Sequence, residues 1–579
     1  METLKTDILI LGTGGAGLFA ALHALKADPD LNIAVAAKGL LGKCGCTRMV
    51  QGGYNAALIP GDSIERHFMD SLIGGSWLPN QDLAWLLVNE APKRILELEN
   101  EAGCFFDRNP DGTLHGKAFA GQTFDRTIHK GDLTGIEIIN RLAEQVWARN
   151  VRRLEECRAV GLIPASDGSL AGVLMVDMRT GDFVWVQAKA VLLATGGGPT
   201  MYRYHTPSGD KACDGMAMAL RAGLPLRDME MVQFHPTGLL AGEGTRLTGT
   251  VLEEGLRGAG GYLLGGDGER FMLKYDERGE RATRDIVSQS IYSEIRSGNC
   301  TEDGGVFIEM SHLGPDNVRR MFKGMVERCA DVGLDLAGGP VPVVPTAHYM
   351  MGGIEIGLDC STALPGLYVA GEDTGGVHGS NRLGGNGVAD STVFGGVAGG
   401  AMAPFARGRN AHAEPDRALL DEARARCLSP YEKPAGDLAG MLTRLSNLMW
   451  DKAGITRDKA GLQDALAGLE DLTGELAQTG VPKSTRAFDL NWHQWLNLEN
   501  MILTSRAIAA SALSRESSQG SHHRSDFPDK GDPKDAAFVS VRLDSDKLAL
   551  KTTPVDFTRV RPGDTLPETP IGETGETAT

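Results

Sequence analysis

The sequence lacks long hydrophobic runs, clustered cysteines and an excess of positive charge. No apolar run reaches the ~18 residues that a membrane-spanning helix needs, so none is predicted. The nine cysteines are scattered and form no Cys-x-x-Cys pair, which favours a reducing cytoplasm and argues against an internal iron–sulfur cluster or other metal site. A net charge of −17 argues against nucleic acid and anionic membranes as direct partners. The N-terminus enters a strand pattern directly, as expected of a chain without a secretory signal.

Glycine, by contrast, is abundant, at 76 residues. Residues 7–11 (DILIL) have the pattern of a short buried strand, residues 12–17 (GTGGAG) follow as a glycine turn, and residues 18–25 have a helical pattern. A strand, a glycine turn and a helix in this order can bind the pyrophosphate of a dinucleotide. The motif alone fits NAD as well as FAD. The acidic residue that usually binds the ribose is missing, because Ala37 and Lys38 stand at the end of the second strand.

Further strand patterns at 33–37, 184–194 and 366–370 indicate a doubly wound α/β domain assembled from separated segments. A chain of 579 residues is too long for one core. We expect an α/β dinucleotide-binding domain of Rossmann-like topology, an inserted α+β capping domain and a C-terminal helical domain. The predicted ranges are 1–239 and 346–410 for the binding domain, 240–345 for the cap, 411–530 for the helical domain and 531–579 for a C-terminal tail. From about residue 555 this tail is expected to be mobile or laid over a neighbouring surface.

Several motifs combine basic side chains with glycines, which a hydrophobic core does not need. They are residues 233–238 (QFHPTG), 253–258 (EEGLRG), 283–285 (TRD), 344–353 (VPTAHYMMGG) and 378–386 (HGSNRLGGN). In sequence and order they resemble the substrate- and flavin-binding segments of the succinate dehydrogenase/fumarate reductase flavoprotein family. The resemblance extends from about residue 6 to about residue 530 and implies FAD rather than NAD.

The resemblance also implies a reaction. Hydride would move between flavin N5 and the C2–C3 bond of a succinate- or fumarate-like acid, and electrons would be exchanged with an iron–sulfur partner subunit. Arg382, His235 and His348 would bind and polarise substrate carboxylates, for which the planar fork of an arginine is well suited. Arg284 would donate and accept the proton. Because a guanidinium is permanently charged, its proton loss must be transient, and Glu254 and Arg257 match the relay that would refill it.

The resemblance assigns many positions to the cofactor. Glu372 would accept hydrogen bonds from the ribose. The predicted FAD contacts are Gly12, Gly14, Gly15, Ala16, Gly17, Lys38, Cys46, Thr47, Gln51, Gly52, Gly53, Ala194, Thr195, Gly196, Gly197, Asp214, Glu372, Arg382 and Asn386.

Cys46 departs from the family pattern, because respiratory members carry at this point a histidine that is joined covalently to the flavin. The simplest interpretation is non-covalent FAD. A cysteinyl-flavin thioether is chemically accessible, since a thiolate is a good nucleophile. Cys46 could also be a small buried residue without a chemical role.

Glu253 is the second departure, because the family usually has Thr or Ser there to bind a substrate carboxylate. A second carboxylate would repel the substrate unless it is protonated or neutralised. Either Glu253 swings away, or Arg246 in an apparently longer loop (241–246) neutralises it, or the group bound there is an amide, hydroxyl or amine. Phe119 stands where aspartate oxidases have a glutamate, and therefore resembles the succinate/fumarate enzymes and would pack on the substrate.

Other functions stay open from the sequence. Glu253 and Cys46 favour a stand-alone flavin oxidase or reductase acting on a modified dicarboxylate or an amino dicarboxylate. A flavin-binding chain that only relays electrons is disfavoured, because the basic residues of several separate motifs are all present. We expect a cytoplasmic protein that contacts a membrane only through partner subunits.

Overall fold

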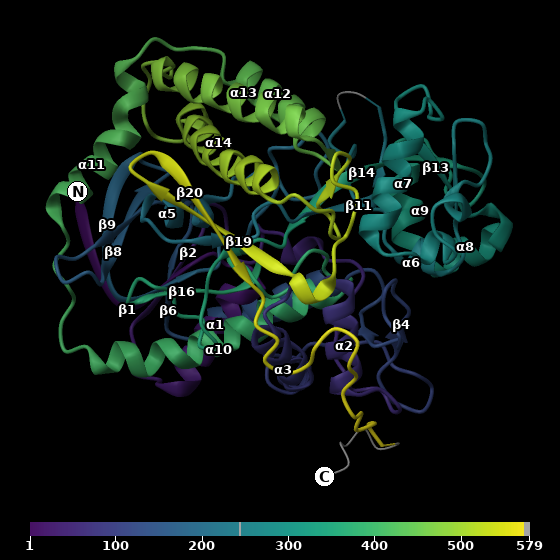
Figure 1. Ribbon diagram of the computed structural model, residues 1–579. Helices are drawn as coiled ribbons and strands as arrows, with labels where there is room; N and C mark the ends of the chain where they lie inside the picture. Colours follow the sequence, from purple (N-terminus) through teal and green to yellow (C-terminus); the bar gives the residue numbers. More distant parts are fainter. Residues whose placement is uncertain (243–244, 573–579) are drawn as a thin grey trace.

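The computed structural model describes residues 1–242 and 245–572. A 7-stranded sheet in the order β6-β2-β1-β9-β8-β7, with β16 also paired to β9, forms the centre of the binding domain (Figure 1). The strands β6, β2, β1, β9 and β16 are parallel, whereas β7 and β8 are antiparallel to their neighbours. Their bounds are β1 Glu2–Leu11, β2 Ile33–Ala36, β6 Val151–Leu154, β7 Cys157–Pro164, β8 Leu170–Asp177, β9 Asp182–Leu193 and β16 Leu367–Val369.

Helices α1 (Gly15–Ala27) and α10 (Asn386–Gly408) pack tightly against each other beside this sheet, although they lie far apart in the sequence. A Cβ at Gly395 would lie 2.5 Å from the carbonyl oxygen of Ala16, so glycine is what lets the two backbones approach. Helix α10 begins in the HGSNRLGGN motif, and α1 begins in the glycine turn. Their contact therefore brings both motifs to one end of the sheet. The remaining helices of this domain are α2 Ile64–Gly74, α3 Gln81–Asn100, α4 Thr134–Trp147 and α5 Asp214–Arg221.

The cap is built on a 4-stranded antiparallel sheet in the order β11-β14-β13-β12. It has a hydrophobic core of its own, made by residues between Leu239 and Val343. In Figure 1 it stands to one side of the central sheet, and β11 and β14 enter it from the binding domain. Its elements are β11 Val232–Leu239, α6 Gly255–Gly258, β12 Tyr262–Leu264, α7 Arg284–Arg296, β13 Val306–Glu309, α8 Pro315–Met321, α9 Lys323–Ala330 and β14 Val341–Met350.

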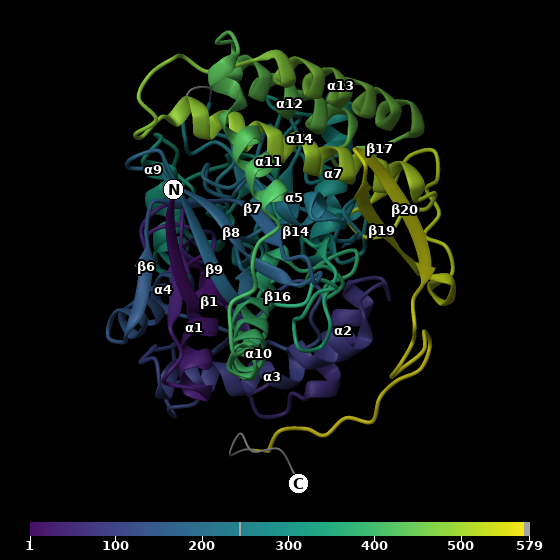
Figure 2. The ribbon, with the colours of Figure 1, turned by 90° about the vertical axis from the view of Figure 1, so that its left-hand side faces the viewer.

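The helical region lies over the β7–β8–β9 end of the central sheet (Figure 2). Trp492 of the longest helix packs edge-on against Phe183 of β9, and both belong to one large hydrophobic core. The helices are α11 Arg417–Leu428, α12 Leu438–Lys452, α13 Lys459–Gln478 and α14 Leu490–Ser514. None of the helices within the described ranges has both the length and the apolar character needed to cross a bilayer.

The C-terminal segment is more ordered than a simple tail. Residues 537–554 form a hairpin of β19 (Ala537–Asp544) and β20 (Lys547–Pro554), in which β19 pairs with β10 (Leu226–Arg227), itself paired with β15 (Gly353–Ile354). The predicted tail that begins at residue 531 therefore contains a hairpin that the prediction did not include. The chain then runs along α2 and α3 (Figures 1 and 2), where the Gln81 side chain donates to the Val560 carbonyl at 2.6 Å.

Candidate active site

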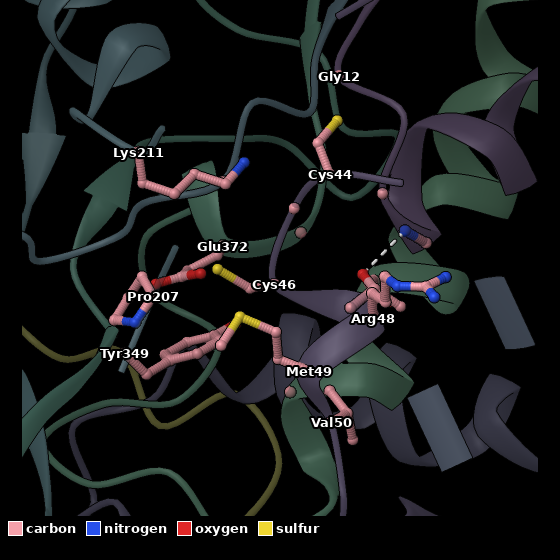
Figure 3. A pocket seen from close by; sticks show the side chains of 18 of the residues that line it. Gly12, Cys44, Cys46, Arg48, Met49, Val50, Pro207, Lys211, Tyr349 and Glu372 are labelled. Carbon is pink, nitrogen blue, oxygen red and sulfur yellow. Dashed lines mark hydrogen bonds between the residues drawn. The ribbon is translucent and has the colours of Figure 1, made fainter. Parts of the chain in front are cut away.

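A cavity of about 540 Å³ opens where the carboxyl ends of β1, β2, β9 and β16 meet the cap strands β11 and β14. This edge is where open α/β sheets bind their ligands, because the loops that follow parallel strands meet there. The glycine turn, the loop around Cys46 and the segment at Glu372 line one part of it (Figure 3). His235, His348, Arg284 and Arg382 line another part of the same cavity.

The glycine turn has the geometry of a pyrophosphate site. Gly12 has φ +115°, and a Cβ there would lie 1.9 Å from the carbonyl oxygen of Ala194, so no other residue fits without backbone movement. A Cβ at Gly17 would lie 1.9 Å from the Gly12 carbonyl oxygen, which makes Gly17 a packing residue rather than a cavity residue. Gly14 and Gly15 line the cavity at the start of α1, and the N-terminus of a helix favours an anion.

The loop 44–53 closes the cavity over this turn. The Thr47 hydroxyl accepts a hydrogen bond from the Gly15 N–H at 2.9 Å and so fixes the loop to α1. In Figure 3 the Cys46 sulfur faces Glu372, and burial together with this carboxylate raises the pKa of the thiol to about 12. Cys46 is therefore a neutral thiol, which is a poor nucleophile.

Glu372 and Asp214 are held differently. Glu372 Oε1 accepts hydrogen bonds from the N–H groups of Met350 (3.0 Å) and Gly198 (3.1 Å), and burial raises the pKa of this carboxyl to about 7. Asp214 is engaged within the protein by Lys38 at 2.6 Å and Arg158 at 2.8 Å. The positive charge of Lys38 is thus already paired with a buried carboxylate at the position where an acidic ribose ligand is missing.

Two histidines face each other across the cap sheet, His235 on β11 and His348 on β14, with ring centroids 5.4 Å apart. His348 Nδ1 is 2.8 Å from the Thr206 hydroxyl, which orients the ring. Burial and then the positive charge of Arg284 hold the pKa of each imidazole well below its usual range. Both rings are therefore neutral at physiological pH and present hydrogen-bonding nitrogens rather than positive charge.

Gln233 joins the two active-site arginines. Its Oε1 accepts a hydrogen bond from Arg284 Nη1 and another from Arg382 Nη2, each at 3.0 Å. Arg382 also lies over the Tyr349 ring, 4.3 Å from its centroid. Burial and then Arg284 lower the pKa of Arg382 to about 10, so it stays charged at neutral pH. Two guanidinium groups are held side by side by one amide oxygen.

Behind Arg284 lies a buried chain of alternating charges. Arg284 contacts Glu254 Oε2 through Nε (2.8 Å) and Nη2 (2.6 Å), and Arg257 Nη2 lies 3.7 Å from Glu254 Oε1. Burial acts to raise the pKa of Glu254, but the charges of Arg284 and Arg257 outweigh it and lower the pKa. Arg257 donates to the Glu280 carbonyl at 2.7 Å, and the Glu280 carboxylate pairs with the partly exposed Arg270. The chain thus leads from the cavity toward solvent.

Phe119 and Glu253 complete the cavity wall. Phe119 is 8 % exposed, and its ring packs against Gly52 and Gly384, where a Cβ would lie 2.4 and 2.5 Å from ring atoms. Glu253 is 3 % exposed, and its Oε2 lies 3.7 Å from Lys117 Nζ. Arg246 is exposed, and the cations that act on Glu253 are Lys117 and Arg328, so the prediction of neutralisation by Arg246 is wrong. Residues 243 and 244 of the predicted longer loop lie outside the described residues.

Known proteins match almost the whole chain. The family description "FAD binding domain" matches residues 7–388, and "Fumarate reductase flavoprotein C-term" matches residues 442–568. One subunit of the CoM/CoB fumarate reductase of Methanothermobacter marburgensis is 40% identical over 531 residues, covering 91% of this chain and 95% of that one. The fumarate reductase flavoprotein subunit of Mycobacterium tuberculosis is 34% identical over 586 residues, covering 97% and 99%. This chain belongs to the succinate dehydrogenase/fumarate reductase flavoprotein family.

A solved structure of the family has the same fold. A variant of the E. coli quinol fumarate reductase chain FrdA superposes with a TM-score of 0.92 at 32% identity, covering 97% of this chain and 99% of that one. The predicted family and α/β fold class are confirmed, and the chain is an FAD-dependent oxidoreductase acting on CH–CH bonds. The residues of the cavity fit FAD, because the Gly12 turn admits a close backbone approach and the start of α1 favours a phosphate.

The structure gathers most of the residues predicted from family motifs, but not all of them. Gly17, Gly197, Arg257 and Asn386 do not line the cavity. The Asn386 side chain is engaged elsewhere, since its Oδ1 accepts from Asn55 at 2.7 Å and its Nδ2 donates to Ser71 at 3.1 Å. Arg257 stands behind Glu254, as a relay member would.

Other cavity residues escaped the sequence reasoning. Gln233 and Tyr349 lie inside the QFHPTG and VPTAHYMMGG motifs, so their position beside predicted site residues was a signal that could have identified them. Lys211, whose Nζ donates to the Thr195 carbonyl at 2.8 Å near Cys46, and Arg328 of the cap, which donates to the Val251 carbonyl at 2.6 Å, stand in no motif. Only the docking of the cap on the binding domain brings Arg328 to the cavity.

Proposed function

We propose that this chain is the flavoprotein subunit of a fumarate reductase, acting on fumarate or a closely related unsaturated dicarboxylate. The observation that carries the proposal is the pair of guanidinium groups joined by Gln233, with the Glu254–Arg257 chain behind one of them. One arginine is placed to bind a carboxylate and the other to give up a proton that can be replaced. The names of the relatives at 40% and 34% identity, both fumarate reductase subunits, agree with this assignment.

The chain's own residues would divide the work as follows. When bound, FAD supplies hydride transfer at N5. Arg382 takes a substrate carboxylate, and the neutral His235 and His348 add hydrogen bonds that stabilise enolate-like charge. Arg284 gives its proton to the carbon next to the one that receives hydride. The lowered pKa keeps Glu254 ionised, so the replacement proton passes from Arg257 through the Glu254 carboxylate to Arg284, and Arg257 is reprotonated from solvent. Each guanidine is therefore uncharged only briefly.

The electron partner and the direction of the reaction are part of the same proposal. Within the part of the chain that the structure describes, no group of His, Cys, Asp and Glu residues is arranged to hold a metal ion. We infer that an iron–sulfur subunit exchanges electrons with the flavin, since the relatives are themselves subunits. Loss of the covalent histidyl link would lower the flavin potential and favour reduction of the double bond. Membrane contact would be made through such partners.

Reoxidation by fumarate tests the assignment. We expect the anaerobically reduced holoprotein to return to oxidised flavin within the mixing time of an ordinary absorbance experiment when fumarate is added. Succinate, which has no double bond to reduce, is the control; when it is added to the same reduced sample, the flavin should stay reduced. A stand-alone oxidase acting on an amino dicarboxylate, which Glu253 would favour, would instead be reoxidised by oxygen with release of peroxide and would ignore fumarate.

Flavin attachment gives a second prediction. We expect acid denaturation to release all of the flavin into the supernatant, because the raised pKa of the Cys46 thiol keeps it neutral and therefore a poor nucleophile. The measurement is the visible absorbance of pellet and supernatant. The matched variant Cys46→Ser should release flavin to the same extent. Flavin retained in the parent pellet but released from Cys46→Ser would establish a cysteinyl link instead.

A further inference from the structure

Glu253 is a buried carboxyl group that the proposed reaction does not use. It lines the cavity directly before the relay residue Glu254. Its Oε2 is buried and, among the residues that the structure describes, has no hydrogen-bond partner. The nearest cation, Lys117 on β4 (Gly116–Lys117), is 3.7 Å from Oε2, beyond hydrogen-bond distance. A buried polar atom without a partner is destabilising, so a ligand that satisfied this carboxyl group would gain affinity.

The charges around Glu253 do not hold it as a tight ion pair. Lys117 donates a hydrogen bond to the Gly131 carbonyl (2.8 Å), and Arg328 on α9 donates one to the Val251 carbonyl (2.6 Å). Asp132, from the loop before α4, adds a second negative charge. Burial raises the pKa of Glu253, Asp132 adds to the rise, and Lys117 and Arg328 oppose it without cancelling it. Arg284 is paired with Glu254, the next residue in the chain, so the cations that act on Glu253 are Lys117 and Arg328.

Protonation changes what this group can recognise. An ionised carboxylate only accepts hydrogen bonds, whereas a protonated carboxyl donates one. An O–H donor facing a carboxylate makes a short, charge-assisted hydrogen bond. An ammonium group, which has only donors, would instead be favoured by an ionised Glu253.

We propose that Glu253 is a specificity-determining residue that binds one carboxylate of a dicarboxylate substrate as a hydrogen-bond donor, in its protonated form, while Arg382 takes the other carboxylate. The inference rests on the proposed function, since it concerns the same substrate. It makes binding depend on one proton. Below the pKa of Glu253 the dianion binds without proton exchange, and above it each binding event takes up a proton from solvent. Affinity therefore falls with rising pH, by about tenfold per pH unit in the limit.

Malonate is a suitable probe, because it is a dicarboxylate without the neighbouring carbons needed for hydride and proton transfer. Its dissociation constant is measured on the oxidised holoprotein from the change in flavin absorbance, between about pH 7 and about pH 9, where both carboxyls of the probe are ionised. Calorimetry in buffers of different ionisation enthalpy gives the protons taken up. We expect weakening by at least tenfold across this range and uptake that approaches one proton per site at the upper end.

Glu253→Gln is the matched variant, since the amide has the same shape and a hydrogen-bond donor at every pH. We expect it to bind malonate with a flat pH profile and without proton uptake. Glu253→Thr, which restores the hydroxyl common in the family, serves if the amide disturbs folding, and should also give a flat profile. Any slope that both variants keep reports other groups, such as Glu372, whose pKa lies at about 7.

Two results would overturn the inference. One is a parent profile that matches Glu253→Gln, with no proton uptake. The other is tighter binding of an amino dicarboxylate such as aspartate than of malonate at high pH, which would mean an ionised Glu253 reading an ammonium group. The proposed function fails separately, if fumarate does not reoxidise the reduced parent protein at about pH 6, whatever the malonate profile.

Discussion

Replacing Arg284 by glutamine should lower kcat for fumarate reduction by about 10²–10⁴-fold, the usual contribution of a positioned proton donor. Arg284 is the arginine that contacts both the cavity and Glu254, so its loss breaks the route by which a proton reaches substrate. Arg382 stays in place to bind a carboxylate, and we therefore expect KM and malonate affinity to change far less than kcat. Steady-state kinetics with an artificial electron donor measure the split.

Suitable variants separate chemistry from folding. Arg284→Lys keeps the positive charge beside Glu254, but a single ammonium cannot contact Glu254 and Gln233 as the guanidinium does. It should bind flavin normally and still lose most of the activity. Arg281→Gln, three positions away, removes an exposed arginine that donates to the Gly258 carbonyl at 3.0 Å, and should keep near-parental activity. Arg284→Gln with more than a tenth of parental kcat would remove Arg284 from the proton route.

The binding-domain sheet was predictable because its signals are local. Each strand is a short apolar run, and the turns after β1 and β9 contain glycines that the structure places at positive φ, such as Gly12 and Gly196. A strand, a turn and a helix that adjoin in sequence need no distant information to be recognised. The C-terminal hairpin was missed for the opposite reason. β20 alternates poorly between buried and exposed residues, and β19 pairs with the two-residue strand β10 more than 300 residues earlier.

The residues of the candidate site also differ in whether a local motif predicts them. Residues inside motifs, such as His235 and Arg382, were found because the motif carries its own context. Arg328 belongs to the cap and Lys117 to a short strand of the binding domain, and only the docking of the cap brings both of them near Glu253. Asn386 shows the limit of motif reasoning, since it stands in a matched segment but donates its amide to Ser71 instead of facing the cavity.

Glu253 is informative because it differs from the Thr or Ser that the family usually has at this position. The motif predicted a residue at this position that contacts substrate, and the glutamate raised a conflict of charge that sequence could not resolve. The structure supplies the surroundings on which our proposal rests: burial, an Oε2 without a partner among the described residues, and cations that are already hydrogen-bonded to carbonyl groups. Protonation state depends on such surroundings, which residue order alone does not give.

Replacing Arg382 by methionine should weaken malonate binding by about 10²–10⁴-fold. Two hydrogen bonds to a charged carboxylate contribute about 1.5–3 kcal/mol each, and methionine supplies neither. Arg382 has donor capacity to spare, because its Nε is buried without a hydrogen-bond partner in the described part of the chain. The measurement is the flavin absorbance titration with malonate, with flavin content as the check on folding.

Arg382→Lys distinguishes charge from geometry at this position. The ammonium keeps the positive charge, but it has no planar fork of donors with which to bond Gln233 and bind a carboxylate at the same time. We expect binding intermediate between parent and Arg382→Met, and a larger loss with the dicarboxylate malonate than with the monocarboxylate acetate, because correct placement of one carboxylate determines whether the second reaches Glu253. Equal losses for both ligands would mean that Arg382 contributes only positive charge, and the two-ended binding of the substrate would have to be abandoned.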